Sequence, residues 1–137
     1  MSTLSSPIEI EEEIYFYDTD CGGVVHNLAY LRLVEKARSI LFRERLGFDA
    51  KKMNETQVFP AVVRTEADYL KSAKLGDQLV IQAHFESIER LRITCHFTIS
   101  LLSAPDKPLM KCIQTTILVQ MPSGKPKRVP QEWIATT

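Results

Sequence analysis

The sequence predicts an α+β fold in which one long helix lies against the apolar face of a five-stranded antiparallel sheet. A single segment, residues 28–46, has helical periodicity, and it stands between one short alternating segment and four longer ones. Each alternating segment is apolar on one side only, which is typical of antiparallel strands with one solvated face. Short connections such as Gly76-Asp77 and Glu89-Arg90 allow neighbouring strands to pair as hairpins. This order favours a sheet that curves around the helix.

The first predicted strand begins at Ile8 and is amphipathic. Ile8, Ile10, Ile14 and Phe16 lie on one face of the alternating segment, opposite a face of glutamates and tyrosines. Turn-forming residues at 18–23 then interrupt the alternation, so we expect the strand to end before them.

The predicted helix has an apolar stripe on one side and basic residues on the other. At helical spacing, the stripe consists of Tyr30, Leu33, Val34, Ala37 and Leu41. Gly47 is a natural terminator, which gives a helix of about 19 residues and about 28 Å. A second, short helix is expected around residues 49–54.

Four further strands are predicted after Gln57, over residues 63–69, 79–85, 91–101 and 113–121. The segment 91–101 has the cleanest pattern, because apolar residues occupy every second position. In the last strand the two alternating sets are Ile113, Thr115, Ile117 and Val119, and Gln114, Thr116, Leu118 and Gln120. His84 and His96 fall on the polar faces of adjacent strands and are candidate cross-strand neighbours. Two surface histidines are a more common arrangement there than a metal site.

Composition sets the broad class of protein. A length of 137 residues fits one domain, 1–137, with residues 1–7 expected to be disordered and 122–130 to form a loop before Trp133. Lysine and arginine number 17 and aspartate and glutamate 17, so no global charge attracts nucleic acid. No transmembrane run, secretory signal or CxxC spacing is present, which predicts a cytoplasmic domain without a zinc site. Because one helix leaves sheet edges open, we expect a homodimer or homotetramer.

Residues 17–27, Tyr-Asp-Thr-Asp-Cys-Gly-Gly-Val-Val-His-Asn, have unusual chemistry and connect the first strand to the helix. A helix N-terminus has unpaired N–H groups and a partial positive charge, which suit an anion or a developing oxyanion. Cys21 resembles a nucleophile, but two flanking carboxylates disfavour its thiolate. Asp20 is the better candidate to attack a carbonyl or to activate water against it. The same residues also fit an ordinary turn and helix cap, so local chemistry leaves both readings open.

Several short motifs together carry a family resemblance. They are Asp18-Thr-Asp20, Gly22-Gly-Val-Val25, Tyr30 and Glu35-Lys-Ala-Arg38, followed by Val62-Val-Arg64, Ala67-Asp-Tyr69 and Leu75-Gly-Asp77. With them the chain resembles hotdog-fold acyl-CoA thioesterases of the 4-hydroxybenzoyl-CoA thioesterase family, and in particular its YbgC-like branch, from Ile10 to Pro130. The resemblance implies a curved sheet wrapped around a long helix, with sites at the interface of two protomers and dimers that often pair into tetramers.

The resemblance also implies roles at the site. It assigns the catalytic carboxylate to Asp20 and a carbonyl-polarising backbone N–H to the first helical position, near Asn27. Two positions depart from the family pattern, because Cys21 replaces the usual Ala or Pro and the histidine of the YbgC-like branch belongs at Asn27. Here His26 comes one residue earlier, a rotation of about 100° on a helix. His26 is therefore either an auxiliary acid/base or a side chain that lines the site entrance.

The substrate contacts follow from the same resemblance. Arg90 and Arg92 correspond to basic residues that bind the phosphates of coenzyme A, and Lys71, Lys74 and residues 125–128 are further candidates. The acyl group is expected between protomers along the helix, against Gly23, Val25, Tyr30, Phe59 and Val62. No metal and no cofactor are expected, since coenzyme A is part of the substrate.

We therefore expect an acyl-CoA thioesterase that uses Asp20 as nucleophile or general base. A hydrolase of an aromatic thioester, such as hydroxybenzoyl- or dihydroxynaphthoyl-CoA, is the alternative enzyme. A non-catalytic hotdog protein that binds acyl-CoA is the alternative from another class. A hotdog dehydratase is disfavoured by the displaced His26.

Overall fold

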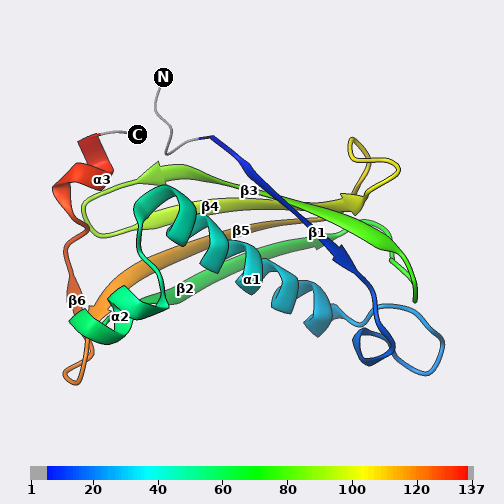
Figure 1. The fold of residues 1–137 in the computed structure, drawn as a ribbon, viewed down its shortest axis with the longest axis horizontal. Coiled ribbons are helices and arrows are strands. Elements are labelled where there is room, and N and C mark those ends of the chain that lie inside the picture. The colour runs from blue at the N-terminus through cyan, green and yellow to red at the C-terminus, as the bar shows by residue number, and fades with distance from the viewer. Residues whose placement is uncertain (1–5, 136–137) are drawn as a thin grey trace.

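The computed structural model describes residues 6–135 and confirms the α+β architecture, with one long helix along one face of a curved antiparallel sheet (Figure 1). The strand order is β1-β3-β4-β5-β2, and every pairing is antiparallel. The elements are β1 (Ile8–Glu13), α1 (Asn27–Leu46), α2 (Ala50–Thr56), β2 (Val58–Tyr69), β3 (Gln78–Ile88), β4 (Ile93–Leu101), β5 (Pro108–Gln120), β6 (Lys125–Lys127) and α3 (Gln131–Ala135).

The sheet has six strands in place of the predicted five. The additional strand, β6, lies within the segment that was predicted as a loop, and it pairs with residues 118–120 of β5. Since β4 pairs with β5 only as far as Thr116, β6 takes the place of β4 beside the last residues of β5. The predicted disorder of residues 1–7 falls mostly outside the described residues.

Helix α1 begins and ends within one residue of the prediction. His26 is its N-cap, and Gly47 ends it with a φ of +64°, a conformation that glycine adopts without strain. The short helix predicted around 49–54 is α2, which Asp49 caps. Within residues 6–135 no helix is both long enough and apolar enough to cross a membrane.

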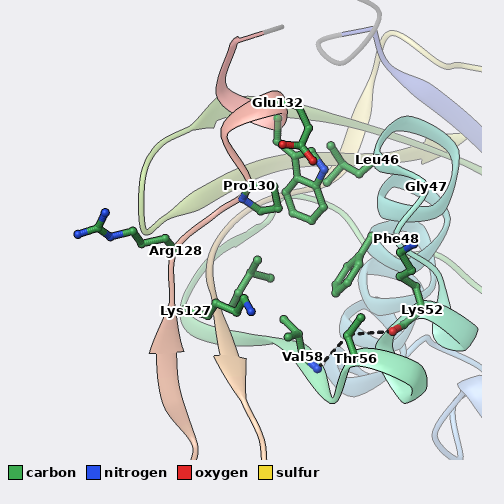
Figure 2. Close-up of a pocket in the computed structure, with 12 residues that line it drawn as sticks. Leu46, Gly47, Phe48, Lys52, Thr56, Val58, Lys127, Arg128, Pro130 and Glu132 are labelled. Carbon is green, nitrogen blue, oxygen red and sulfur yellow. Dashed lines mark hydrogen bonds between the residues drawn. The ribbon is translucent and has the colours of Figure 1, made fainter.

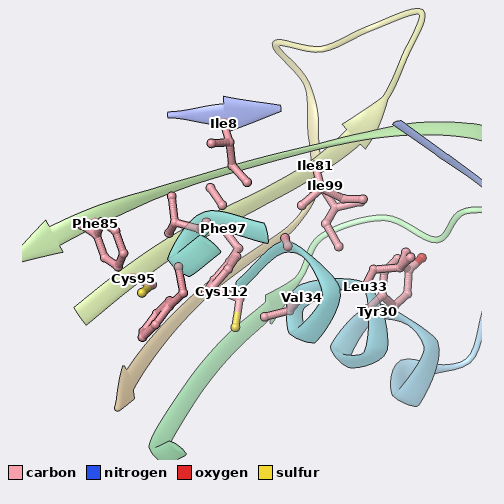
Figure 3. Close-up of a cluster of buried hydrophobic side chains, with 14 of the residues drawn as sticks. Ile8, Tyr30, Leu33, Val34, Ile81, Phe85, Cys95, Phe97, Ile99 and Cys112 are labelled. Atoms are coloured by element: carbon pink, nitrogen blue, oxygen red, sulfur yellow. The ribbon is translucent and has the colours of Figure 1, made fainter. Parts of the chain in front are cut away.

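The core lies between α1 and the inner face of the sheet (Figure 3). The alternation predicted for β3 and β4 is confirmed inside the strands, where the buried apolar residues are Leu79, Ile81, Ala83 and Phe85, and Ile93, Cys95, Phe97 and Ile99. The predicted start of β4 is wrong, because the strand begins at Ile93 and Leu91 is exposed, and Leu101 is only partly buried. Burial of one large apolar side chain contributes roughly 1.5–3 kcal/mol. The position of α1 on the sheet is therefore fixed mainly by hydrophobic packing.

The first strand ends earlier than predicted, and Phe16 does not lie on its buried face. Strand β1 ends at Glu13, and residues 16–18 form a 3₁₀ turn in which Phe16 is 75% exposed. The turn forms because the Asp18 carboxylate accepts the Tyr15 N–H at 3.0 Å, while the Asp18 N–H donates to the Tyr15 carbonyl at 2.9 Å. This local competition for backbone groups overrides the alternation. Ile14 is buried, as predicted.

The buried face of β5 is the more polar of its two alternating sets. Gln114 and Leu118 are buried, whereas Ile117 lies on the outer face and is only half-buried. The polar set faces inward because Arg38 Nη1, from α1, donates to Gln114 Oε1 at 2.7 Å, and Gln114 Nε2 donates to Thr65 Oγ1 at 3.3 Å. Buried polar groups need such partners. Here the partners come from a helix and from another strand, so the pattern of β5 alone does not reveal them.

His84 and His96 are cross-strand neighbours, as the sequence suggested. They pair directly in the register of β3 and β4, and their ring centroids are 5.2 Å apart. Desolvation by burial, and then the neighbouring His96, lowers the pKa of His84. His96 Nε2 lies 3.0 Å from Glu86 Oε1. Across residues 6–135, no three His, Cys, Asp or Glu side chains gather in a way that could hold a metal ion.

The three cysteines should differ sharply in reactivity. Burial raises the pKa of Cys95 to about 12 and that of Cys112 to about 11, whereas Cys21 is exposed. Because the thiolate is the reactive form, we expect one thiol per native chain to react rapidly with Ellman's reagent at about pH 8. All three should react after unfolding in guanidinium. Rapid labelling of a native Cys21→Ala variant would contradict the burial of the other two.

Candidate active site

Residues 17–27 form a loop that connects β1 to α1 and folds back on itself. Thr19 and Val25 pair as an isolated antiparallel bridge, and the His26 N–H donates to the Asp18 carbonyl at 3.2 Å. Asp20 directly follows Thr19 of this bridge, and α1 begins two residues after Val25. The fold therefore holds the acidic residue and the helix N-terminus, the two features singled out in the sequence, at the same end of the molecule.

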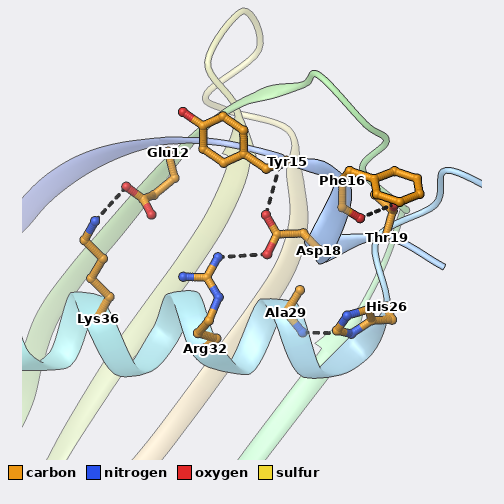
Figure 4. Close-up of polar contacts among 9 residues, drawn as sticks. All are labelled: Glu12, Tyr15, Phe16, Asp18, Thr19, His26, Ala29, Arg32 and Lys36. Atoms are coloured by element: carbon orange, nitrogen blue, oxygen red, sulfur yellow. Dashed lines mark hydrogen bonds and ion pairs between the residues drawn. The ribbon is translucent and has the colours of Figure 1, made fainter.

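Asp18, the first acid of the motif, is an internal anchor of the loop. It is 1% exposed, its Oδ1 accepts from Arg32 Nη2 at 2.9 Å, and its Oδ2 accepts from the Tyr15 N–H (Figure 4). Because Arg32 belongs to the second turn of α1, this ion pair ties the loop to the helix. With both oxygens engaged and no access to solvent, Asp18 is part of the fold and is not presented to a ligand.

Asp20, the second acid, is exposed and only partly engaged. Its Oδ1 accepts the Gly22 N–H at 3.0 Å, and no described group donates to its Oδ2. The Gly23 N–H donates to the Asp20 carbonyl at 3.0 Å in a tight turn, where the φ of Gly23 is +73°. The turn orients the carboxylate and leaves one oxygen open. This arrangement suits a carboxylate that attacks a carbonyl or removes a proton.

The loop is held against the connection between β2 and β3. The Val25 N–H donates to the Ala73 carbonyl at 3.0 Å, and the Leu75 N–H donates to the Gly23 carbonyl at 2.9 Å. Beneath this contact, the Ala73 N–H donates to Tyr30 Oη at 2.7 Å. Tyr30 is buried, and that burial is the main cause that raises the pKa of its phenol. Tyr30 therefore supports the loop from the core, and its contact with substrate stays a prediction.

Helix α1 begins at Asn27, directly after its N-cap. Nδ1 of the capping His26 accepts the Ala29 N–H at 3.2 Å (Figure 4), so the cap occupies one imidazole nitrogen. The N–H groups of Asn27 and Leu28 have no acceptor among the described residues, as is usual in the first turn of a helix. Together with the positive end of the helix dipole, such donors can polarise a carbonyl. The catalytic roles of Asn27 and His26 stay predictions.

The residues predicted to contact the acyl group lie in different surroundings. Val25 is buried under the loop, whereas Phe59 and Val62 lie on β2, at the edge of the sheet. Phe59 pairs with Val119 on the outer face, and Val62 pairs with Thr116 on the face toward α1. Phe59 and Val62 therefore cannot line the same pocket of one protomer. Their contact with substrate, like that of Gly23, stays a prediction.

Arg90 and Arg92 lie at the opposite end of the molecule from Asp20. Both are exposed in the turn between β3 and β4, at the left of Figure 1, whereas the loop between β1 and α1 lies at the right. The Arg90 carbonyl accepts the Val129 N–H at 2.8 Å, which fixes the backbone of this turn. One protomer thus brings together Asp20, His26 and Asn27 but not the two arginines.

Sequence reasoning missed the parts of the site that come from other elements. Arg32 is one of several basic residues on the polar side of α1, and the hydrogen bonds of residues 73–75 to the loop use only backbone atoms. Neither leaves a signal in the sequence. Three large apolar side chains next to the motif are also strongly exposed, namely Phe16 at 75%, Tyr17 at 70% and Leu28 at 73%. Large apolar side chains with such exposure are candidates for contact with a ligand or another chain.

Known proteins resemble this chain in both sequence and fold. A family model described as the thioesterase-like superfamily matches residues 14–136. An acyl-CoA thioesterase YbgC from Haemophilus influenzae is 38% identical over 77 residues, 56% of each chain, and an acyl-CoA thioester hydrolase YbgC from Escherichia coli is 27% identical over 122 residues, 89% of each chain. The solved structure of a 1,4-dihydroxy-2-naphthoyl-CoA thioesterase from Synechocystis superimposes with a TM-score of 0.81 at 20% identity, over 93% of each chain. The predicted hotdog fold is confirmed.

The two acids of the motif should respond differently to the same substitution. Asp18→Asn loses a charge-assisted hydrogen bond to Arg32 inside the fold, so we expect the free energy of unfolding to fall by about 1–3 kcal/mol. Asp20→Asn is the matched control and should change it by less than about 0.5 kcal/mol, because an exposed amide keeps the contact with Gly22. Urea denaturation measures both. Equal losses would show that Asp18 is not the anchor of the loop.

Proposed function

This chain belongs to the thioesterase-like superfamily, and we propose that it hydrolyses the thioester of an acyl-CoA to a free acid and coenzyme A. The observation that carries the proposal is the carboxylate of Asp20, which is exposed, oriented by Gly22, open at one oxygen and held at the same end of the molecule as the N-terminus of α1. A carboxylate that attacks or activates water, and free backbone N–H groups that stabilise the oxyanion, are together able to hydrolyse a thioester.

Asp20 can act on the thioester carbonyl in two ways. As a nucleophile it forms an acyl anhydride and expels the coenzyme A thiolate, and water then hydrolyses the anhydride. As a general base it takes a proton from water, which attacks the carbonyl carbon directly. Either route breaks one C–S bond, consumes one water and places negative charge on the carbonyl oxygen, where the Asn27 N–H stabilises it. Loss of such a donor costs about 10²–10³ in rate. We place His26 at the entrance, since its Nδ1 is occupied by the helix cap.

The separation of Asp20 from the two arginines supports a site shared between two protomers. Strand β2 is an edge of the sheet, because among residues 6–135 only β5 pairs with it, and its twelve residues present a long row of unpaired backbone groups. A second copy that paired antiparallel with this edge would run in the opposite direction. The end that carries Arg90 and Arg92 of one protomer would then lie beside Asp20 of the other. We therefore propose a homodimer as the active unit, with a homotetramer as a further assembly.

Turnover on a panel of thioesters identifies the acyl group. The Synechocystis structure is that of an aromatic-CoA thioesterase, but at 20% identity the likeness concerns the fold alone. We propose that the exposed side chains of Phe16, Tyr17 and Leu28 cover the acyl group or the partner protomer, and that the enzyme acts in the cytoplasm. Thiol release from a panel of short-chain, long-chain and aromatic acyl-CoAs tests the proposed function. No turnover on any of them would favour a non-catalytic acyl-CoA-binding protein.

The substitution Asp20→Asn should remove most hydrolysis while leaving the fold intact. The amide keeps the shape of the side chain but can neither attack nor accept a proton, so we expect kcat to fall by about a hundredfold or more with little change in KM. The control is Cys21→Ala, which should stay within about twofold of the unmodified enzyme. An inactive Cys21→Ala variant beside an active Asp20→Asn variant would assign the chemistry to the thiol.

The paired change Arg90→Ala and Arg92→Ala should raise KM for acyl-CoA about tenfold or more, through lost guanidinium–phosphate contacts. The effect should nearly vanish on an acyl-pantetheine substrate, which lacks the nucleotide phosphates. Lys107→Ala, an exposed cation in the connection between β4 and β5, is the matched control.

Mixing this double variant with Asp20→Asn at low substrate concentration tests the shared site. Half of the randomly mixed dimers would each contain one intact site, so about a quarter of the original activity should return. Activity no higher than the sum of the two variants would place the arginines and Asp20 of each site in one protomer.

A further inference from the structure

A cavity of about 400 Å³ lies at the end of the molecule opposite Asp20 (Figure 2). The end of α1, helix α2, the start of β2 and the segment from β6 to α3 enclose it. No residue of the loop between β1 and α1 lines it, so it is separate from the candidate active site within a protomer. Its volume lies in the range of about 300–1,000 Å³ that is usual for small-molecule pockets.

The inner part of the cavity is apolar and partly aromatic. Phe48, Val58 and Trp133 are all less than a tenth exposed, and the rings of Phe48 and Trp133 meet edge to face with centroids 5.4 Å apart. If each non-hydrogen atom of a ligand occupies about 30 Å³, as water does in the liquid, the cavity holds about 13 of them. An acyl chain of medium length, or a single aromatic ring with substituents, matches this space.

The rim of the cavity is basic. Lys52, Lys127 and Arg128 line it and are exposed, and Lys52 and Lys127 lie on opposite sides of Phe48 and Val58 in Figure 2. None of these three cations takes part in an ion pair among the described residues. Glu132 is the only acidic residue of the lining. An apolar interior under an excess of unpaired cations is complementary to a ligand with an apolar body and an anionic head.

We propose that this cavity binds a carboxylate with an apolar body, such as a medium-chain fatty acid. The chain lies against Phe48 and Trp133, and the carboxylate meets the rim at Lys52 and Lys127, since the side chain of Arg128 points away from the cavity in Figure 2. The choice of a carboxylate over another anionic head rests on the proposed function, because hydrolysis of an acyl thioester releases one. The cavity is then a second site for the class of product that the enzyme makes, remote from the Asp20 of its own protomer.

The position of Trp133 allows a direct test, because it is the single tryptophan of the chain. Titration of the full-length protein with decanoate should change the tryptophan fluorescence in a saturable way, and calorimetry should give the same Kd. Decan-1-ol, which has the chain without the charge, should bind at least about tenfold more weakly. The paired change Lys52→Gln and Lys127→Gln should weaken decanoate about tenfold and leave decanol unchanged. Lys107→Gln, in the connection between β4 and β5, is the matched control.

The failure of this proposal is distinguishable from failure of the proposed function. Fluorescence does not require turnover, so the Asp20→Asn variant should bind decanoate with unchanged Kd even when it releases no thiol. The proposal is overturned if decanoate gives no saturable change or if decanol binds as tightly. It is also overturned if coenzyme A without an acyl group gives the same response, since the cavity would then belong to the nucleotide site. Loss of the response in Asp20→Asn would assign it to the active site.

Discussion

The buried contact between Asp18 and Arg32 is the interaction on which the candidate site depends. It places a charge inside the fold, which is tolerated because the guanidinium and the Tyr15 N–H engage both carboxylate oxygens. This contact fixes the loop to α1. Asp18 also ends β1 through its hydrogen bonds with Tyr15, and its carbonyl accepts the His26 N–H that closes the loop. Among residues 6–135, the carboxylate of Asp20, two residues later, accepts a hydrogen bond only from the Gly22 N–H, so one of its oxygens stays open. Asp18 therefore stabilises the loop, while the carboxylate of Asp20 keeps one oxygen accessible.

The elements that the sequence predicted correctly are those in which apolar residues recur at a regular spacing over many positions. Helix α1 and strands β3 and β4 bury many residues at one period, so a single exception does not change the outcome. The wrong expectation at Phe16 turned on local polar contacts of Asp18 with Tyr15, and the choice of the buried face of β5, which the sequence left open, turns on the contact of Gln114 with Arg38. The contact of Gln114 with Arg38 joins residues far apart in the chain, and a pattern read along one segment contains no information about it.

The residues of the candidate site also fall into those that the sequence could identify and those whose relative positions it could not. Asp20 and the helix start could be found because they are adjacent in sequence and share a motif. The distance between Asp20 and Arg90 depends on how β3 and β4 run across the sheet. The sequence does not show that the two residues lie at opposite ends of the molecule, and the structure does. The balanced total charge hides this arrangement, since Arg90, Arg92, Lys127 and Arg128 gather at one end. The basic end of a protomer is therefore the end that lacks Asp20.

The backbone hydrogen bonds between residues 73–75 and the loop have a consequence for evolution as well as for chemistry. They fix the number of residues between Asp20 and Asn27, because a deletion or insertion there would shift one of the two against the other. The connection between β4 and β5 carries no such restriction. Its tip, residues 103–107, hydrogen-bonds only within itself and to Leu101. Related sequences can therefore differ in the length of that hairpin, and an epitope or a reporter domain inserted there would leave the contacts between residues 73–75 and the loop unchanged.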